Sequence, residues 1–242
     1  MASPADDARA LALVVSCEHA GRTVPRRFAR LFAGQGGELA SHRGWDPGAL
    51  ELAREMATAF ATPLHACATT RLLVEVNRSP HHPHLFSHIS RFLPQEERER
   101  VLAEIYHPYR EAVAAEIEAH LTSGRDVLHV LVHSFTPIMD GADRRTDLAL
   151  LYDPARPREK ALADAWLAAI ATRAPVLRLR RNYPYKGTAD GLEVAFRRRF
   201  PPERYLGITL EACQAFPLGA AGPWRALRST VIEALAECLG RE

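Results

Sequence analysis

Lysine is almost absent from this sequence of 242 residues. Lys160 and Lys186 are the only lysines among the 31 basic residues, so arginine supplies nearly all of the positive charge. An arginine is therefore informative here only through its neighbours. The formal net charge is just +2, which gives no reason to expect a nucleic-acid or membrane-surface partner.

Cysteine is also scarce, and the four cysteines are far apart. Cys17, Cys67, Cys213 and Cys238 form no CxxC pair and no dense cluster, which argues against a zinc knuckle and a disulfide scaffold. No apolar run approaches the roughly 20 residues of a membrane-spanning helix. The N-terminal segment MASPADDARA is acidic and polar, unlike a signal peptide. These absences predict a soluble protein of a reducing, cytoplasmic compartment.

The short motifs of several enzyme classes are missing as well. The sequence contains no HExxH, no GxSxG, no P-loop and no GxGxxG. The usual signals of helix-borne zinc sites, serine hydrolases and nucleotide-binding folds are therefore absent. The case for a catalytic site depends instead on the joint occurrence of residues that are distant in the chain.

What the sequence does contain is an alternation of short apolar runs and longer helical segments. Predicted strands are Leu11–Ser16, Thr62–Ala68, Leu72–Val76, Val127–Val132, Asp147–Tyr152 and Tyr205–Leu210, with an extended segment at Val176–Leu179. Predicted helices are Pro47–Phe60 with Asp46 as N-cap, Glu96–Leu121 with a kink at Pro108, Glu159–Ala171 and Pro223–Leu239. This order predicts a mixed, mostly parallel sheet with helices on both faces, in a single domain over 1–242.

Ionisable side chains stand where several of these apolar runs end. His19 follows the first run, His133 follows Val130-Leu131-Val132, and Glu211 ends GITLE. If the strands are parallel, such groups meet at one edge of the sheet. Two histidines and a carboxylate are the usual ligands of a catalytic zinc ion, and a further carboxylate can take a proton from water. The pattern predicts a metal site with a general base.

Each of these residues has a simpler interpretation when it is taken alone. A single histidine at a strand end is more often structural, and Glu211 could pair with an arginine. Asp46 is most simply a helix N-cap, and Arg71 and Arg78 could form surface salt bridges. Only their joint occurrence favours a catalytic site.

Six segments together resemble the N-formylglutamate amidohydrolase family. They are SCEHAGRTVP, HRGWDPGAL, TTRLLVEVNRSPHHP, LVHSFTP, NYPYKGTADG and GITLEACQ, and they extend from about Val14 to Gln214. The resemblance implies the fold of the zinc carboxypeptidases, a three-layer α/β/α arrangement with a mixed, mostly parallel central sheet.

The resemblance also implies roles for individual residues. His19 and His133 match the two histidine ligands of the metal, and Glu211 matches the general base. Arg71 is placed to polarise the scissile carbonyl or to stabilise its oxyanion. The residues implied to bind substrate are Asn77, Arg78, Asn182 and Tyr185.

The third metal ligand departs from the carboxypeptidase pattern. Those enzymes carry His-x-x-Glu, but the residue three positions after His19 is Arg22, which cannot ligate a metal. Asp46, in GWDPGAL, is the preferred substitute. Glu18 is the alternative, although adjacent residues rarely aim at one ion from regular structure.

The expected reaction is zinc-dependent hydrolysis of a linear amide on an N-acylated acidic amino acid. The family implies N-formyl-L-glutamate, which would give formate and glutamate, with Asn77 and Arg78 binding a carboxylate. One alternative is a peptidase or amidase acting on another N-acyl amino acid or peptide, and another is a non-catalytic protein that binds small ligands. Imidazole and carboxylate ligands also suit other divalent transition metals.

The expected partner is a small carboxylate-bearing molecule, with no nucleic acid and no membrane. The oligomeric state is left open by the sequence. The histidine-rich segment 79–92, with His81, His82, His84 and His88, could form a second metal site. A solvated or substrate-covering loop is the preferred interpretation of that segment.

Overall fold

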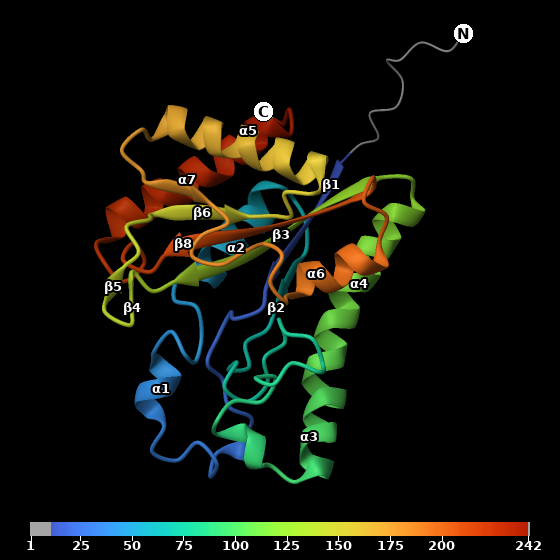
Figure 1. The fold of residues 1–242 in the computed structure, drawn as a ribbon, viewed down its shortest axis with the longest axis vertical. Coiled ribbons are helices and arrows are strands. Elements are labelled where there is room, and N and C mark those ends of the chain that lie inside the picture. The colour runs from blue at the N-terminus through green and yellow to red at the C-terminus, as the bar shows by residue number, and fades with distance from the viewer. Residues whose placement is uncertain (1–10, 242) are drawn as a thin grey trace.

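The computed structural model describes residues 11–241 of the chain (Figure 1). The segment on which the signal-peptide prediction depends lies outside the described residues. Within 11–241, no helix combines the length and the apolar character needed to cross a membrane.

A six-stranded sheet with the order β2-β1-β3-β8-β6-β7 forms the centre of the fold. Its strands are β1 (Leu11–Cys17), β2 (Leu64–Ala66), β3 (Asp126–Phe135), β6 (Leu148–Leu151), β7 (Leu179–Arg181) and β8 (Tyr205–Cys213). Strands β2, β1, β3 and β8 are mutually parallel, while β6 pairs antiparallel with β8 and parallel with β7. The prediction of a mixed, mostly parallel sheet is therefore confirmed.

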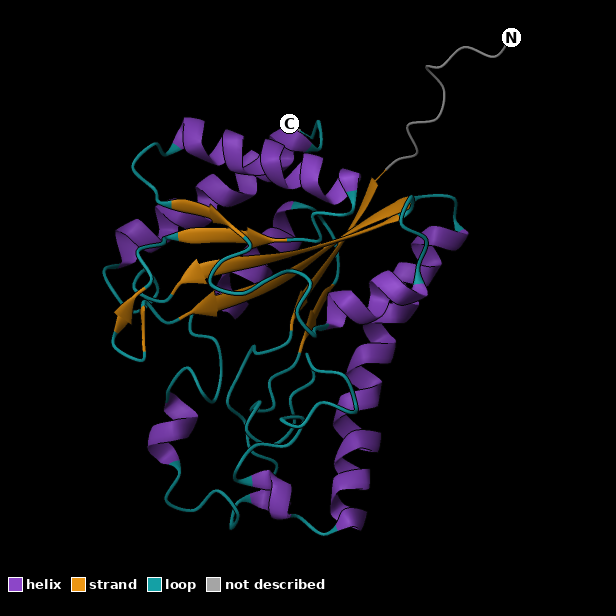
Figure 2. Ribbon diagram, in the orientation of Figure 1, coloured by secondary structure: helices purple, strands orange, loops and turns teal. Residues whose placement is uncertain are grey.

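Helices cover both faces of this sheet (Figure 2). One face packs against α2 (Ala49–Ala59), α5 (Pro157–Arg173) and α7 (Ala221–Cys238), and the other against α4 (His107–Thr122) and α6 (Leu192–Arg199). Side chains of β3 alternate between these two cores: Leu128 and Val130 belong to the first, Val127 and Leu131 to the second. This is the burial expected of a central strand covered on both sides, and it confirms the α/β/α arrangement.

A region rich in loops lies beyond the carboxyl edge of the parallel strands, in the lower half of Figure 1. It contains the segments 18–48 and 67–106 and has its own buried apolar cluster, which includes Phe28, Leu73 and Tyr106. The short elements outside the main sheet and its helices are α1 (Gly36–Ala40), α3 (Gln95–Val101), β4 (Ile138–Met139), β5 (Ala142–Asp143) and the 3-10 turns Arg26–Phe28 and Ser90–Phe92.

Two predicted elements differ from the structure. The run Leu72–Val76 is not a strand: it is buried, but it turns within the loop region and pairs with no strand. A short apolar run indicates burial without fixing the backbone conformation. Helix α6 lies where the sequence predicted neither a helix nor a strand, because its buried apolar side is marked only by Leu192 and Phe196 at i and i+4.

The predicted long helix runs without interruption from Gln95 to Thr122, but its helical geometry changes before Pro108. Helix α3 leads into a π-helical turn at Leu102–Tyr106, and α4 begins at His107. Proline has no N–H to donate, and its ring clashes with the carbonyl four residues earlier in a regular α-helix. The wider turn opens the backbone at that position, so a π turn takes the place of the predicted kink.

Candidate metal centre

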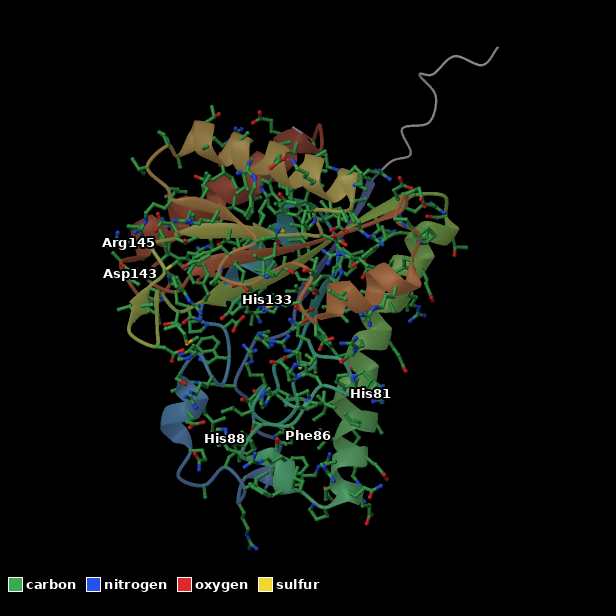
Figure 3. All side chains as sticks on the ribbon, in the orientation of Figure 1. His81, Phe86, His88, His133, Asp143 and Arg145 are labelled. Carbon is green, nitrogen blue, oxygen red and sulfur yellow. The ribbon has the colours of Figure 1, made fainter. Side chains whose placement is uncertain are left out.

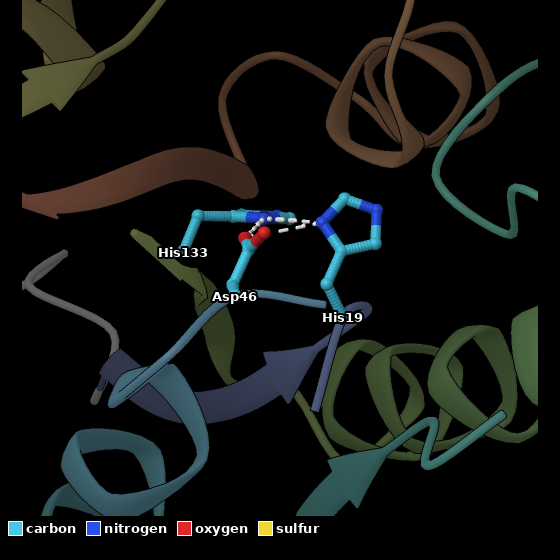
Figure 4. A group of neighbouring side chains, drawn as sticks. All are labelled: His19, Asp46 and His133. Carbon is cyan, nitrogen blue, oxygen red and sulfur yellow. Dashed lines mark hydrogen bonds and ion pairs between the residues drawn. The ribbon is translucent and has the colours of Figure 1, made fainter. Parts of the chain in front are cut away.

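Three buried side chains from separate segments converge at the carboxyl edge of the sheet. His19 follows β1, His133 lies near the end of β3, and Asp46 belongs to the loop before α2. Asp46 Oδ2 lies 3.1 Å from His19 Nδ1 and 2.9 Å from His133 Nδ1, and the two Nδ1 atoms are 3.1 Å apart (Figure 4). Because β1 and β3 are parallel, their ends bring both histidines to one place. We call these residues the metal triad.

The geometry and chemistry of the triad fit a metal ion. A tetrahedral ion with ligands at roughly 2.0–2.2 Å holds its ligand atoms about 3.3–3.5 Å apart, slightly more than the separations found here. Each triad residue offers one ligand atom, and all three residues are buried. No other group of three or more His, Cys, Asp or Glu residues in 11–241 has this arrangement. The histidine-rich segment 79–92 contains no such group.

Asp46 does not act as the predicted N-cap of α2. The helix begins at Ala49 with Gly48 at its N-cap, and no side chain caps it. Gly48 has φ of +83°, and a Cβ atom there would lie 2.5 Å from Cβ of Pro217, so glycine is required in this turn. The prediction was wrong because the turn points the Asp46 carboxylate toward the histidines, where the Ser134 amide also donates to it at 3.3 Å.

The outer nitrogen of each histidine faces a second carboxylate. His19 Nε2 lies 2.6 Å from Glu75 Oε1, and His133 Nε2 lies 2.9 Å from Glu18 Oε2. Glu18 Oε1 also accepts a hydrogen bond from the Tyr109 hydroxyl at 2.8 Å. Metal-binding histidines commonly present the second ring nitrogen to a carboxylate, which leaves the first with its lone pair toward the ion. Glu18 therefore lies on the far side of His133 from the triad.

The charges around the triad also match a divalent cation. Burial opposes ionisation of Glu18, Asp46 and Glu75, but their histidine and arginine partners outweigh it: the pKa of Glu18 falls to about 2, and those of Asp46 and Glu75 fall far below their usual range. Among residues 11–241, Arg71 is the one guanidinium paired with any of these carboxylates, namely Asp46 and Glu75. When a metal displaces the protons from both histidines, three carboxylates and one guanidinium leave two negative charges, which a divalent ion balances.

The same contacts act on the two histidines. Burial lowers the pKa of each imidazole, but the facing carboxylates overcome this and raise the pKa of His19 and, more strongly, of His133. Protons and a metal ion thus compete for the same Nδ1 atoms, because only a neutral imidazole can ligate.

Removal of the metal should destabilise the protein, because the ion neutralises buried charge. An ion present at about 100 times its dissociation constant stabilises the folded state by roughly 2.7 kcal/mol, which corresponds to about 5–10 °C in Tm for a chain of this size. Calorimetric melting with and without a chelator measures the shift. The shift should reverse when metal is added back and should be absent in Asp46→Asn; equal melting temperatures with and without metal would contradict a structural contribution of the ion.

Glu211 lies beside the triad on the neighbouring strand. It pairs in register with His133, and both line the same cavity of about 190 Å³. Within residues 11–241, the buried Oε2 atom of Glu211 has no hydrogen-bond partner. Burial raises the pKa of this carboxyl to about 7. A carboxyl group with these properties is suited to proton transfer at neutral pH.

Arg71 connects the triad to its surroundings. Its Nε donates to Glu75 Oε2 at 2.7 Å, and its Nη1 lies 3.4 Å from Asp46 Oδ1. Both partners are buried, and the guanidinium lines the cavity of the triad. Arg71 is thus part of the site and not an isolated surface salt bridge.

The predicted substrate-binding residues occupy different positions. Asn77, Arg78 and Tyr185 line the cavity of the triad, whereas Asn182 does not. Asn182 Oδ1 instead accepts backbone hydrogen bonds from Tyr152 at 3.1 Å and from Gly187 at 2.9 Å, so it holds the loop that carries Tyr185.

Asn77 and Arg78 are also anchored to the segment before α6. Asn77 Oδ1 accepts a hydrogen bond from the Leu192 amide at 2.8 Å, and Arg78 Nη1 donates to the Asp190 carbonyl. These contacts fix the positions of both side chains at the cavity wall.

Sequence reasoning missed several residues around the triad. Glu18 was considered only as a ligand, and Glu75 was given no role, although it contacts His19. Lys186 and Glu193 also line the cavity. Lysine is rare in this chain, and this rarity could have drawn attention to Lys186, but the sequence interpretation made no use of it.

Fold and site together define an α/β protein whose sheet edge carries a buried group of two histidines and one carboxylate, the ligand set typical of catalytic zinc sites. Comparison with protein families gives a more specific result. Residues 11–216 match the family described as N-formylglutamate amidohydrolase. The chain therefore belongs to this family of hydrolases, as its motifs predicted.

Two solved structures are similar over nearly the whole chain. A gene product from Agrobacterium tumefaciens is 29% identical, with a TM-score of 0.81 over 94% of this chain and 90% of its own. An N-formylglutamate amidohydrolase from Ralstonia eutropha JMP134 is 18% identical, with a TM-score of 0.71 over 97% of this chain and 94% of its own. At that identity the second similarity establishes the fold alone. No curated protein matches the sequence.

Proposed function

We propose that the protein is a zinc-dependent amidohydrolase that cleaves the linear amide of an N-acylated acidic amino acid, with N-formyl-L-glutamate as the expected substrate. The observation that carries the proposal is the position of Glu211 in the cavity of the metal triad, as a buried carboxyl whose Oε2 has no hydrogen-bond partner among residues 11–241. A protein that only bound a ligand would not need such a base. Family membership supports the N-formyl substrate. The free cysteines favour a reducing, cytoplasmic location.

The chain's own residues can perform the proton transfers of amide hydrolysis. A divalent ion bound by the triad supplies Lewis-acid activation of water and of the substrate carbonyl. Glu211 accepts the proton of the attacking water and delivers it to the leaving nitrogen. A carboxyl whose pKa lies near 7 can both take up and release a proton at neutral pH. Arg71 adds positive charge where the carbonyl oxygen becomes negative.

Substrate carboxylates are expected to bind at the part of the cavity wall that Asn77 and Arg78 form. Arg78 and Asn77 are held there by contacts with the segment Asp190–Leu192. A guanidinium presents a planar pair of donors that matches a carboxylate. Tyr185 lines the same cavity from the loop that Asn182 holds, and we assign Asn182 a positioning role in place of direct contact.

Each of the two monoamides of N-formyl-L-glutamate replaces one substrate carboxylate by a neutral amide. The zinc-loaded protein is expected to hydrolyse N-formyl-L-glutamate with about tenfold or more higher kcat/KM than at least one of these monoamides, because that monoamide loses the charge-assisted contact with Arg78. Arg78→Ala should bring that ratio close to one. The matched control is Arg54→Ala, which removes an exposed arginine of α2. Formate release measures all of these rates.

Two outcomes would contradict the proposal at different levels. Comparable turnover of formyl, acetyl and peptide substrates would exclude a specific N-formylglutamate hydrolase. A protein that holds no stoichiometric divalent metal and cannot be loaded with one would exclude the metallohydrolase itself.

A second candidate function is hydrolysis of a larger N-acyl amino acid or peptide by the same residues. It is favoured by a larger hollow of about 680 Å³, which shares Asp46, Arg71, Ser134 and Tyr185 with the cavity of the triad. A formyl group occupies very little of such a volume.

A further inference from the structure

The larger hollow adjoins the metal triad at Asp46 and does not include Arg78 in its lining. We call it the outer hollow, to distinguish it from the smaller inner cavity that contains Asn77, Arg78 and Glu211. Four residues line both spaces: Asp46, Arg71, Ser134 and Tyr185. A substrate whose amide lies at the triad and whose amino-acid part lies in the inner cavity can extend its acyl group past these shared residues into the outer hollow.

The walls of the outer hollow are strongly basic. The basic side chains that line it, besides Arg71, are His42, Arg43, His84, His88 and Arg91. Among the described residues 11–241, Asp46 and Glu75 are the only acidic ones in its lining, and both are engaged by the triad histidines and Arg71. The lining therefore contains more cationic side chains than carboxylates that are free to pair with them.

Two arginines in the hollow are weakly compensated. Arg91 makes no ion pair within residues 11–241, and its guanidinium lies 4.7 Å from the ring centre of Phe92. Arg43 lies 3.8 Å from Glu38, and 61% of its side chain is exposed. The positive field reaches His42, whose pKa is lowered by burial and then by Arg43, Arg71 and Arg144.

Aromatic and apolar groups complete the hollow. Phe86, Phe135, Met139 and Tyr185 line it. The Arg144 guanidinium lies 5.8 Å from the ring centre of Phe135 and 5.2 Å from that of Tyr185, which places a further positive charge beside two of these walls. Figure 3 locates Phe86 and His88 in the loop region below the sheet edge that carries His133.

We propose that the outer hollow is a subsite for an acyl group that ends in a carboxylate, so that the enzyme hydrolyses N-acyl amino acids with an anionic acyl chain in addition to small N-acyl groups. The inference rests on the proposed function. An apolar chain with a terminal carboxylate matches both the aromatic walls and the weakly compensated arginines. The bond cleaved is the same amide, so the chemistry needs nothing beyond water, and the products are a dicarboxylate and the free amino acid.

N-glutaryl-L-glutamate and its terminal amide, N-glutaramoyl-L-glutamate, test the subsite because they have equal length and differ only in the terminal charge. The zinc-loaded protein should hydrolyse the glutaryl compound with about tenfold higher kcat/KM, the effect of one charge-assisted contact. Arg91→Ala should reduce the ratio to less than about threefold. Arg54→Ala, on the exposed side of α2 and outside both spaces, should keep the wild-type ratio.

Binding gives a readout that does not depend on turnover. Calorimetry with zinc-loaded Glu211→Gln should find the glutaryl compound about tenfold tighter than its amide, and the added change Arg91→Ala should remove the difference. A ratio near one in the wild type, or a ratio that survives Arg91→Ala, overturns the subsite. If N-formyl-L-glutamate is still hydrolysed, the proposed function stands. If no amide is hydrolysed, the proposed function fails, and the binding ratio decides the subsite by itself.

Discussion

Replacement of Glu211 by glutamine is expected to lower kcat by about 10²–10⁴-fold while the metal content stays at the wild-type level. Glutamine keeps the size of the side chain but cannot accept the proton of the attacking water. Glu211 is absent from the metal triad, and its Oε2 has no partner within residues 11–241, so no contact of the triad is lost. Single-turnover kinetics and metal analysis of the same sample measure both parts of the prediction.

Glu193 offers a close comparison for this experiment. It also lines the inner cavity, is also buried, and its pKa is likewise raised by burial, but it belongs to α6 and not to the strand that pairs with His133. Glu193→Gln should therefore cost much less turnover than Glu211→Gln. The reverse order would mean that the wrong carboxyl has been assigned as the base.

The second large effect concerns the third metal ligand. Asp46→Asn should weaken metal binding by well over about 100-fold, because it removes a ligand and its charge. Glu18→Gln should weaken it by only about 10–100-fold, the usual loss when a carboxylate partner of a ligating histidine is changed. The physical reason is that Asp46 Oδ2 faces both Nδ1 atoms, whereas Glu18 faces the outer nitrogen of His133.

Competition titration with a chromophoric chelator measures both affinities. Circular dichroism of each variant checks that the fold is retained. If Glu18→Gln lost more affinity than Asp46→Asn, Glu18 would replace Asp46 as the ligand.

The sheet and the two histidines could be predicted from the sequence for one physical reason. Strands that are buried on both faces give continuous apolar runs, and parallel strands end at the same edge. His19 and His133 follow or end such runs, and Glu211 does the same on β8, so their proximity follows from the sheet alone.

Residues outside the strands could not be placed in this way. Asp46 reaches the triad through a turn set by Gly48 and the nearby Pro217, a contact between segments 169 positions apart in the chain. Glu75 lies in the loop region, where burial of Leu73 resembled that of a strand. Such positions depend on how the loops pack against one another, and the local periodicity of apolar residues in the sequence does not indicate this packing.

The contacts of Glu18 restrict insertions and deletions in the chain directly after β1. His19 provides one ligand atom, and the residue just before it supports the other histidine across the sheet. Inserting or deleting one residue after Cys17 would displace both groups together, because Glu18 and His19 are adjacent in the turn that directly follows β1. Changes in loop length can therefore be accommodated far more easily elsewhere around the site than at Glu18-His19, because the positions of both imidazoles depend on this dipeptide.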